Sequence, residues 1–157
     1  MYQVLKIIED KFKDSIYRIG EIKGIYLEDP NFIPKSNLPC IAINPNSTDV
    51  EQADNVRDIH EFDIDILVIM DITQKLGKPG NEVVGVEFLT EMMEARNSDG
   101  TLKENTILSI IRNNLDLGEG YKIGNISSVT YSPEVRQQHV TKEASINITV
   151  QRLLNRR

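Results

Sequence analysis

Residues Arg57–Asp71 alternate between apolar and polar in a way that predicts a long β-strand. From position 60 the even positions hold His60 and then only apolar residues, whereas the odd positions begin with three carboxylates and become apolar at Leu67 and Ile69. Because successive side chains of a strand point to opposite faces of a sheet, one face belongs to a core throughout. The other face changes from water-facing to covered near Leu67, which predicts a second packing partner or a subunit contact there.

A second long strand is expected at His139–Leu153. Its apolar residues occupy the even positions from Ala144 to Val150, and polar residues occupy the odd positions between them. A shorter strand is expected before it at Gly124–Tyr131, followed by a polar connection that begins with Ser132-Pro133-Glu134. The two patterns predict an antiparallel sheet with one solvated face.

Three segments carry apolar residues at helical intervals. Tyr2–Ile16 places one apolar stripe among charged residues, and Glu82–Arg96 has a similar spacing. Thr101 and Glu104 have the spacing of a capping box, in which the threonine accepts a backbone hydrogen bond and the glutamate reaches back. A third helix is therefore expected to start after this box and to end near Asn114.

Shorter elements and loops complete the pattern. Ile22–Leu27 and Cys40–Asn44 are expected to be short strands, the second one stopped by Pro45. Asn46–Asn55 is expected to be an exposed loop, and Gln74–Asn81 is also expected to be a loop. We therefore expect a single α+β domain over residues 1–157, with a mainly antiparallel sheet of four to five strands and an N-terminal helix and two further helices packed on it.

The composition is that of a globular protein with an acidic balance. The 157 residues carry a formal net charge of -6 and include no tryptophan. General electrostatic binding to nucleic acid is disfavoured, because it depends on Lys and Arg displacing counterions from phosphates. The only basic run, Arg152–Arg157, is interpreted as a solvated terminus.

Cys40 is the only cysteine, so one chain has neither an internal disulfide nor a cysteine-rich zinc site. Its apolar neighbours predict a small core residue and not a nucleophile. No apolar signal core follows Met1, and no segment approaches a membrane-spanning length. We expect a protein that stays in the cytoplasm where it is made and has no membrane partner.

Glu61, Asp63 and Asp65 share one strand face and are the strongest candidates for a metal site. Carboxylate oxygens suit Mg²⁺ or Ca²⁺, but a strand separates alternate residues by nearly 7 Å, so the backbone does not bring them together. The nuclease version of this site needs a strand that carries Glu-x-Lys, and Glu21-Ile22-Lys23 supplies only that short string. An acidic, solvated sheet face is the preferred interpretation, with no metal.

The other candidates for chemistry are also interpreted as structural. His60 and His139 each begin a strand among polar residues, without a second ligand nearby in sequence. Met92 and Met93 are interpreted as core or interface filler. Two glycine-rich runs lack the pattern of a phosphate-binding loop. These runs are Gly77-Lys78-Pro79-Gly80 and Gly118-Glu119-Gly120.

The order of these elements resembles the tail terminator, or tail completion, proteins of long-tailed bacteriophages. An amphipathic N-terminal helix precedes a proline-bounded strand, Pro39-Cys40-Ile41-Ala42-Ile43-Asn44-Pro45, and the long strand Arg57–Asp71. Two helices and a final hairpin, Ile126–Tyr131 with Ala144–Arg152, complete the order. The resemblance spans most of the chain and contains no catalytic motif.

The resemblance implies a structural protein of the virion, assembled in the host cytoplasm. Proteins of this family cap the tail tube as a ring, usually a hexamer, stop its polymerisation and join it to the head-completion or connector protein. No catalytic, cofactor-binding or metal-binding residues are carried over. If DNA passes through the ring without specific binding, an acidic lumen would repel its phosphates. The expected lining is Glu61, Asp63 and Asp65, or the loop Asn46–Asn55 with Asp49, Glu51 and Asp54.

Two other classes of function remain open. A nuclease or other metal-dependent enzyme predicts carboxylates that bind Mg²⁺ or Mn²⁺, with Asp63 among them. A monomeric adaptor in a head, neck or secretion assembly predicts the same sheet without self-association.

Overall fold

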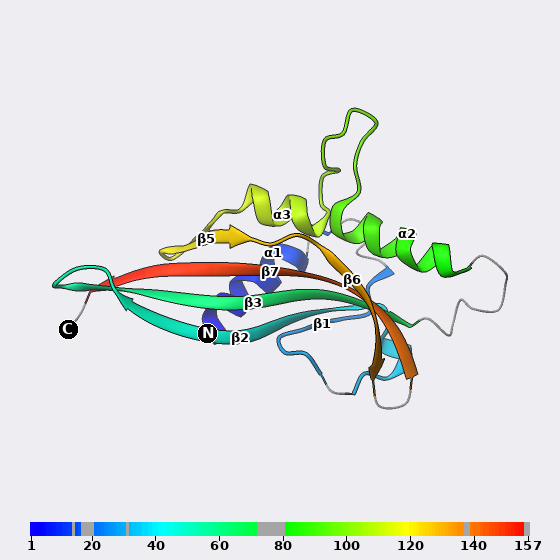
Figure 1. Cartoon of the computed structure of the whole chain (residues 1–157), viewed down its shortest axis with the longest axis horizontal. Coiled ribbons are helices and arrows are strands. Elements are labelled where there is room, and N and C mark those ends of the chain that lie inside the picture. Colours follow the sequence, from blue (N-terminus) through cyan, green and yellow to red (C-terminus); the bar gives the residue numbers. More distant parts are fainter. Residues whose placement is uncertain (14, 17–20, 31, 72–80, 137–138, 156–157) are drawn as a thin grey trace.

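We describe a computed structural model of the chain, leaving out residues 14, 17–20, 31, 72–80, 137–138 and 156–157. Three helices, one 3-10 turn and seven strands are assigned among the described residues (Figure 1). In chain order they are α1 (Tyr2–Lys13), β1 (Ile25–Tyr26), the 3-10 turn η2 (Lys35–Asn37), β2 (Cys40–Gln52), β3 (Arg57–Asp71), α2 (Asn81–Glu94), α3 (Ile107–Asn113), β4 (Asp116–Gly118), β5 (Tyr121–Ile126), β6 (Thr130–Arg136) and β7 (His139–Asn155). None of the described helices is long and apolar enough to cross a membrane.

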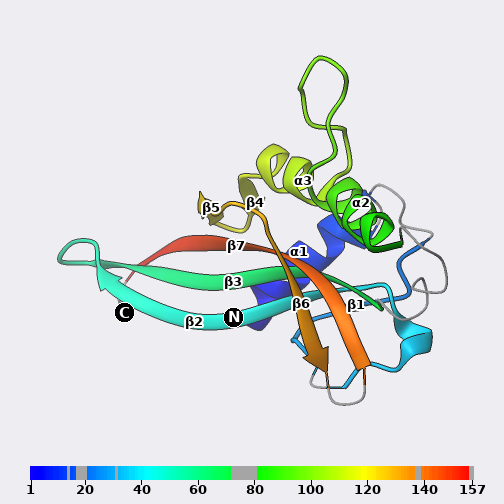
Figure 2. The same cartoon turned by 45° about the vertical axis from the view of Figure 1, so that its right-hand side comes forward.

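The strands form one sheet in the order β1-β2-β3-β7-β5-β4, with β6 also paired to β7. All pairs are antiparallel except β1 and β2, which run parallel. The sheet is therefore mixed, and it curls strongly into a half-barrel (Figure 2). The predicted α+β class is confirmed, whereas the prediction of four to five strands is wrong. One additional strand is β4, whose three residues are too few for alternation to be visible. The other arises because the single strand expected at Gly124–Tyr131 is two strands, β5 and β6.

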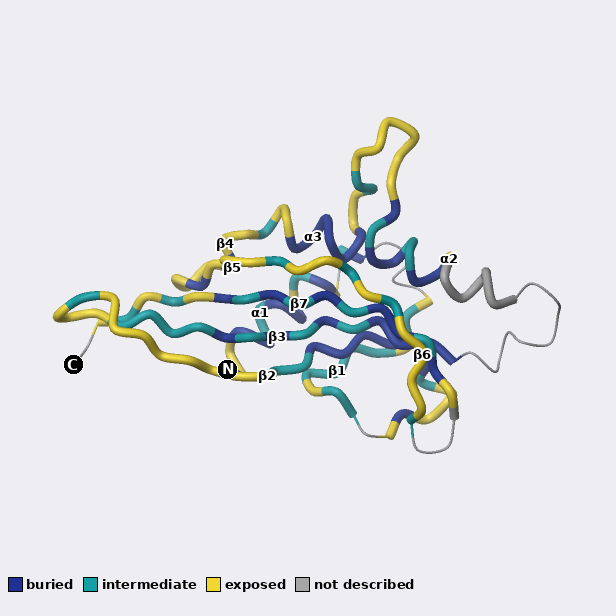
Figure 3. The backbone as a smooth tube through the Cα atoms, viewed as in Figure 1, coloured by how far each residue is buried: buried dark blue, intermediate teal, exposed yellow. Residues whose placement is uncertain are grey.

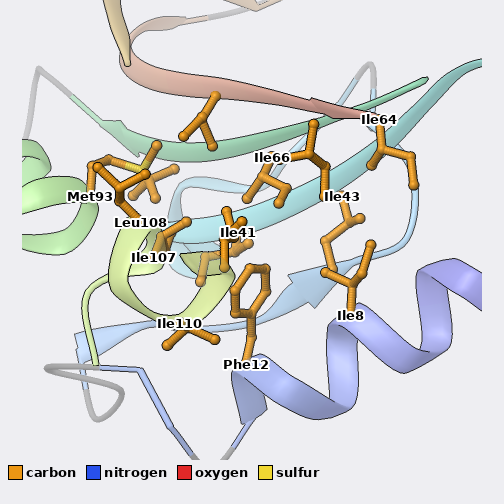
Figure 4. Close-up of a cluster of buried hydrophobic side chains, with 14 of the residues drawn as sticks. Ile8, Phe12, Ile41, Ile43, Ile64, Ile66, Met93, Ile107, Leu108 and Ile110 are labelled. Carbon is orange, nitrogen blue, oxygen red and sulfur yellow. The ribbon is translucent and has the colours of Figure 1, made fainter. Parts of the chain in front are cut away.

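Helices α1, α2 and α3 all contribute to a core on one face of the sheet (Figure 4). Phe12 from α1 and Ile107 from α3 lie in this core with Ile66 of β3 and Ile146 of β7, and all four are almost fully buried. The even positions of β3 and β7 thus face the core, as their alternation predicts. Burial of each such side chain contributes roughly 1.5–3 kcal/mol to folding. Met92 and Met93 of α2 are also fully buried in this core.

The opposite face is also covered where Leu67 and Ile69 lie. Ile33 and Leu38, from the segment between β1 and β2, pack there against Cys40 and Ile69 in a second, smaller core. Leu67 is partly buried against the same cluster. Of the two partners predicted at this position, the structure shows a packing partner from the same chain.

Strand β2 continues past Pro45 to Gln52, so the strand end predicted at Asn44 is wrong. The predicted loop Asn46–Asn55 is wrong for the same reason, because its first seven residues belong to β2 and six of them, Ser47 to Gln52, pair with β3. A bulge lies between Pro45 and Ser47, where the register with β3 shifts. Proline is tolerated here because its nitrogen faces the outer edge of the sheet, where no ladder hydrogen bond is lost.

A tight turn joins β2 to β3. The Asp54 carboxylate accepts hydrogen bonds from the backbone N–H groups of Val56 at 2.9 Å and Arg57 at 2.8 Å. The Arg57 side chain adds a contact to the same carboxylate at 2.6 Å. The hydrogen bonds from Val56 and Arg57 hold the pKa of Asp54 below its ordinary value.

Helix α3 is capped by Thr106 and not by Thr101. The Thr106 hydroxyl accepts a hydrogen bond from the Ser109 N–H at 3.3 Å. Thr101 instead closes its own turn, because its hydroxyl donates to Asp99 at 2.6 Å. The predicted capping box of Thr101 and Glu104 is therefore wrong, and the predicted end of the helix near Asn114 is confirmed.

The strand expected at Gly124–Tyr131 is divided into β5 and β6. Ser132-Pro133-Glu134, predicted to be a connection, lies inside β6 and pairs with β7. The strand was not predicted there because β6 is a largely exposed edge strand and Pro133, which is typical of a connection, lies in its middle. Helix α1 ends at Lys13, before the predicted Ile16. Residues 74–80 of the loop expected at Gln74–Asn81 lie outside the described residues, and Asn81 begins α2.

Candidate interaction surface

The face of the sheet opposite the helices carries a continuous polar strip, which we call the polar sheet face. Its carboxylates come from β2 and β3, and its neutral side chains come mainly from β7. The cross-strand register places Glu61 between Asp49 and Gln151, and Asp65 between Asn44 and Asn147. The members are Ser47, Asp49, Glu51, Glu61, Asp63, Asp65, Asn147, Thr149 and Gln151.

Neutral amides hold the β3 carboxylates in place. Nδ2 of Asn147 donates to Asp63 at 2.7 Å and to Asp65 at 2.8 Å. Nε2 of Gln151 donates to Glu61 at 2.8 Å. Among the described residues, no ion pair involves any of these three carboxylates. The amides therefore orient the carboxylates without neutralising their charge.

The metal-site hypothesis finds no support in this geometry. Within the described part of the chain, no group of three or more His, Cys, Asp and Glu side chains is placed to hold a metal ion. An amide nitrogen of Asn147 lies between Asp63 and Asp65, and such a group donates hydrogen bonds and does not ligate cations. Glu21-Ile22-Lys23 precedes β1 and is not part of a strand. The Glu-x-Lys motif of the nuclease hypothesis would have to lie on a strand, so this segment does not fit it.

The two histidines do not form a pair. His60 lies opposite Arg152 in the β3–β7 ladder, whereas His139 is the first residue of β7. His139 and Arg152 are thirteen positions apart along β7, which corresponds to roughly 40 Å along an extended strand.

Cys40 is a core residue, as the sequence predicts. Its side chain is fully buried in the second core. Burial raises the pKa of the Cys40 thiol from 9.0 to about 12. At neutral pH the thiol is therefore protonated and unreactive.

The glycine-rich and basic runs have structural surroundings where they are described. Gly118-Glu119-Gly120 forms the tight turn between β4 and β5, with positive φ at all three residues. Gly77-Lys78-Pro79-Gly80 lies outside the described residues. From the basic run, Arg152 stacks over the ring of Tyr121, 4.6 Å from its centroid, and donates to its hydroxyl at 3.0 Å.

Sequence reasoning missed a second charged cluster, at the opposite end of β7. Arg136 of β6 contacts Glu143 of β7 at 2.5 Å and Asp29 at 2.6 Å. Thr141 donates to the same glutamate at 2.8 Å. The hydrogen bonds that Arg136 donates to Glu143 and Asp29 raise its pKa above the ordinary value, although burial opposes them. The cluster ties the segment after β1 to the β6–β7 hairpin.

No protein-family model and no curated protein matches the chain.

Proposed function

We propose that this chain is a structural protein of a bacteriophage tail. In this proposal it forms a ring that caps the tail tube, stops tube polymerisation and makes the joint to the head connector. The order of its elements supports the proposal, because an N-terminal helix, a long pair of strands, two helices and a final hairpin follow one another as in tail terminators. The polar sheet face is the single observation that carries it furthest.

The polar sheet face suits the lumen of a ring that DNA crosses. Glu61, Asp63 and Asp65 are bound by neutral amides and, among the described residues, not by cations. Asp49 and Glu51 extend the acidic strip across β2. Two unit charges about 4 Å apart interact by only ~1 kcal/mol in water, so each repulsion is weak. Repetition of the strip in every subunit of a ring multiplies the effect and disfavours adsorption of phosphates.

Ring formation needs a head-to-tail contact that closes by rotation. All three helices lie on the other face of the sheet, so the polar sheet face stays open to the lumen while other surfaces form the contact. A hexamer is the expected size, in line with the family that the chain resembles.

The proposal is tested first by mass and then by imaging. Size-exclusion chromatography with light scattering should give a closed oligomer, and negative-stain images with purified tail tubes should show it at tube ends. A protein that stays monomeric at every concentration and leaves tube ends bare would contradict the proposal and favour the monomeric adaptor.

The lumen assignment has a separate test. Replacement of Glu61 and Asp63 by Lys should leave ring formation intact but make the ring retain double-stranded DNA at low salt. A matched double replacement of Glu91 and Glu104 by Lys places the same charges away from the polar sheet face and should not retain DNA. An assembled ring with the whole polar sheet face on its outer wall would refute this assignment.

A further inference from the structure

The outer edge of β2 is open over most of its length. Strand β1 pairs only with Ile41 and Ala42 of β2, because Tyr26 is its last residue. From residue 46 to residue 52, no described strand lies on that side of β2, and every residue of this stretch is exposed (Figure 3). An unpaired edge of this length can accept another strand.

Two hydrogen bonds define which backbone groups point outward from this edge. At one end, the Ile41 N–H donates to Gly24 on the β1 side. At the other end, the Ala53 N–H donates inward to Arg57 at 3.0 Å. Antiparallel pairs alternate between hydrogen-bonded and non-hydrogen-bonded, so counting back from Ala53 leaves Thr48, Val50 and Gln52 with outward N–H and C=O groups. Counting forward from Ile41 directs the nitrogen of Pro45 outward too, which agrees with its lack of an N–H.

The side chains beside this edge differ between the two faces of the sheet. On the polar sheet face, Asp49 and Glu51 lie on the edge strand itself, and Asp49 is opposite Glu61. On the other face the edge presents Thr48, Val50 and Gln52, and Val50 is 56% exposed. A strand added here would place its side chains about 5 Å from these residues. Charge complementarity favours Lys or Arg on one face and neutral or apolar residues on the other.

An apolar groove lies at the Pro45 end of the open edge. Its volume is about 570 Å³, and it is formed by the start of α1, the segment around β1 and the bulge of β2. Pairing with β2 stops at Pro45 because proline has no N–H to offer. A chain that leaves the edge at this point enters the groove. Its apolar lining includes Tyr2, Leu5, Tyr26, Leu27, Pro30 and Pro45.

We propose that the β2 edge from Thr48 to Gln52 binds an extended segment of a partner protein by strand addition. The segment carries Lys or Arg at alternate positions, facing Asp49 and Glu51, and places an apolar or aromatic side chain in the groove beside Pro45. This inference does not depend on ring formation or on the position of the chain in a virion.

A second copy of this chain is a poorer occupant than a basic segment. The β6 edge of the same sheet would present Ser132 and Glu134 to Asp49 and Glu51. Those side chains are neutral or acidic, and Pro133 deprives that edge of one N–H. The formal net charge of -6 also opposes close approach of two copies.

The test uses blocked, fluorescein-labelled peptides and the full chain, with binding followed by fluorescence anisotropy. The first peptide alternates threonine and lysine and has a tyrosine at each end, so that either strand direction reaches the groove. The second replaces lysine by glutamate, and the third groups the same threonines and lysines into two blocks. The first peptide should bind, the second should not, and the third should bind at least about fivefold more weakly.

Variants separate strand addition from simple charge attraction. Val50→Pro removes an outward N–H and places a ring where the partner carbonyl must approach, so binding should weaken at least about fivefold. Val50→Ala keeps the N–H and should bind within about twofold of the wild type. Asp49→Asn with Glu51→Gln should weaken binding about fivefold to tenfold at low salt, and less at 0.5 M salt. Glu104→Gln, an exposed charge elsewhere, should have no effect. A thermal melt verifies that each variant is folded.

Four results would overturn the inference. One is failure of the wild-type chain to bind the alternating peptide. Another is equal binding by folded Val50→Pro and Val50→Ala, which would mean that the acidic surface attracts any cation. Equal binding of the alternating and block peptides leads to the same conclusion. The fourth result is that the free wild-type chain forms an oligomer that is lost in Val50→Pro and kept in Val50→Ala. It would mean that the β2 edge binds a second copy of this chain.

Discussion

Arg136 on β6 donates from Nε to Glu143 on β7 at 2.5 Å and from Nη2 to the other oxygen of the same carboxylate at 3.0 Å. The two side chains are 11% and 5% exposed, so this bidentate pair is one of the most deeply buried charge interactions described. Its neighbour Asp29 binds the same guanidinium from the segment that covers the second core. The pair therefore holds two parts of the molecule together.

Replacement of Arg136 by Met should lower the free energy of unfolding by about 3–5 kcal/mol, because Glu143 is left as a buried charge without its partner. Urea denaturation followed by circular dichroism measures the change. The double replacement of Arg136 by Met and Glu143 by Gln should be more stable than the single variant. A single variant that loses less than about 1 kcal/mol would show that the pair contributes little.

Replacement of Asn147 by Asp should destabilise the fold by about 1–3 kcal/mol at pH 7, because two hydrogen bonds to carboxylates are exchanged for charge repulsion. Urea denaturation at pH 7 measures the loss. Asn55→Asp adds the same charge to an exposed turn and should stay within about 0.5 kcal/mol of the wild type. Equal losses in the two variants would contradict the bridging role of Asn147.

Thr106→Ala should lower stability by about 1 kcal/mol, because it removes the only side-chain cap described for α3. Thr101→Ala is the matched control, since its hydroxyl lies in an exposed turn and should contribute less than about 0.5 kcal/mol. Thermal or urea denaturation of the two variants decides between the caps. A larger loss for Thr101→Ala would restore the capping box that the sequence suggested.

The Cys40 thiol should make stability depend on alkaline pH. Its pKa of about 12 in the folded protein lies above the ordinary 9.0, so the unfolded chain releases this proton first as the pH rises. The stabilising contribution is complete below pH 9 and is lost progressively between pH 9 and 12. The wild type should therefore lose stability more steeply than Cys40→Ala over that range, by at most ~1.4 kcal/mol per pH unit. Parallel curves for the two proteins would refute the shift.

Strand β3 shows why alternation is the most reliable signal in this chain. Its predicted bounds, Arg57 and Asp71, agree with the structure because β2 and β7 pair with it along almost its whole length. Residues of β3 are buried where they face one of the two cores, and the residues at those positions are apolar. The pattern of apolar residues therefore predicts the strand and its buried positions. The outer half of β2 is exposed on both faces, so its residues are mostly polar. Its composition of Asn, Ser, Thr and Asp therefore gave no sign of the backbone hydrogen bonds that pair it with β3.

The polar contacts were harder to predict than the strands that carry them. The common face of Glu61, Asp63 and Asp65 followed from period two, but their partnership with Asn147 depends on the register between β3 and β7. The Arg136 cluster combines residues 107 positions apart in the sequence. A local sequence pattern cannot predict a contact between residues so far apart in the sequence, because only the folded sheet brings them together.

Strand β7 pairs with β3, β5 and β6, and all three precede it in the chain. While the polypeptide is being synthesised, Ile64 and Ile66 of β3 therefore lack their partners Ile148 and Ile146 until β7 has been made. Contacts of such long sequence separation form slowly, and the unpaired β2–β3 hairpin is prone to aggregation in the interval. The position of β7 in the sheet thus leaves one side of the β2–β3 hairpin without its partner strand until residues 139–155 have been synthesised.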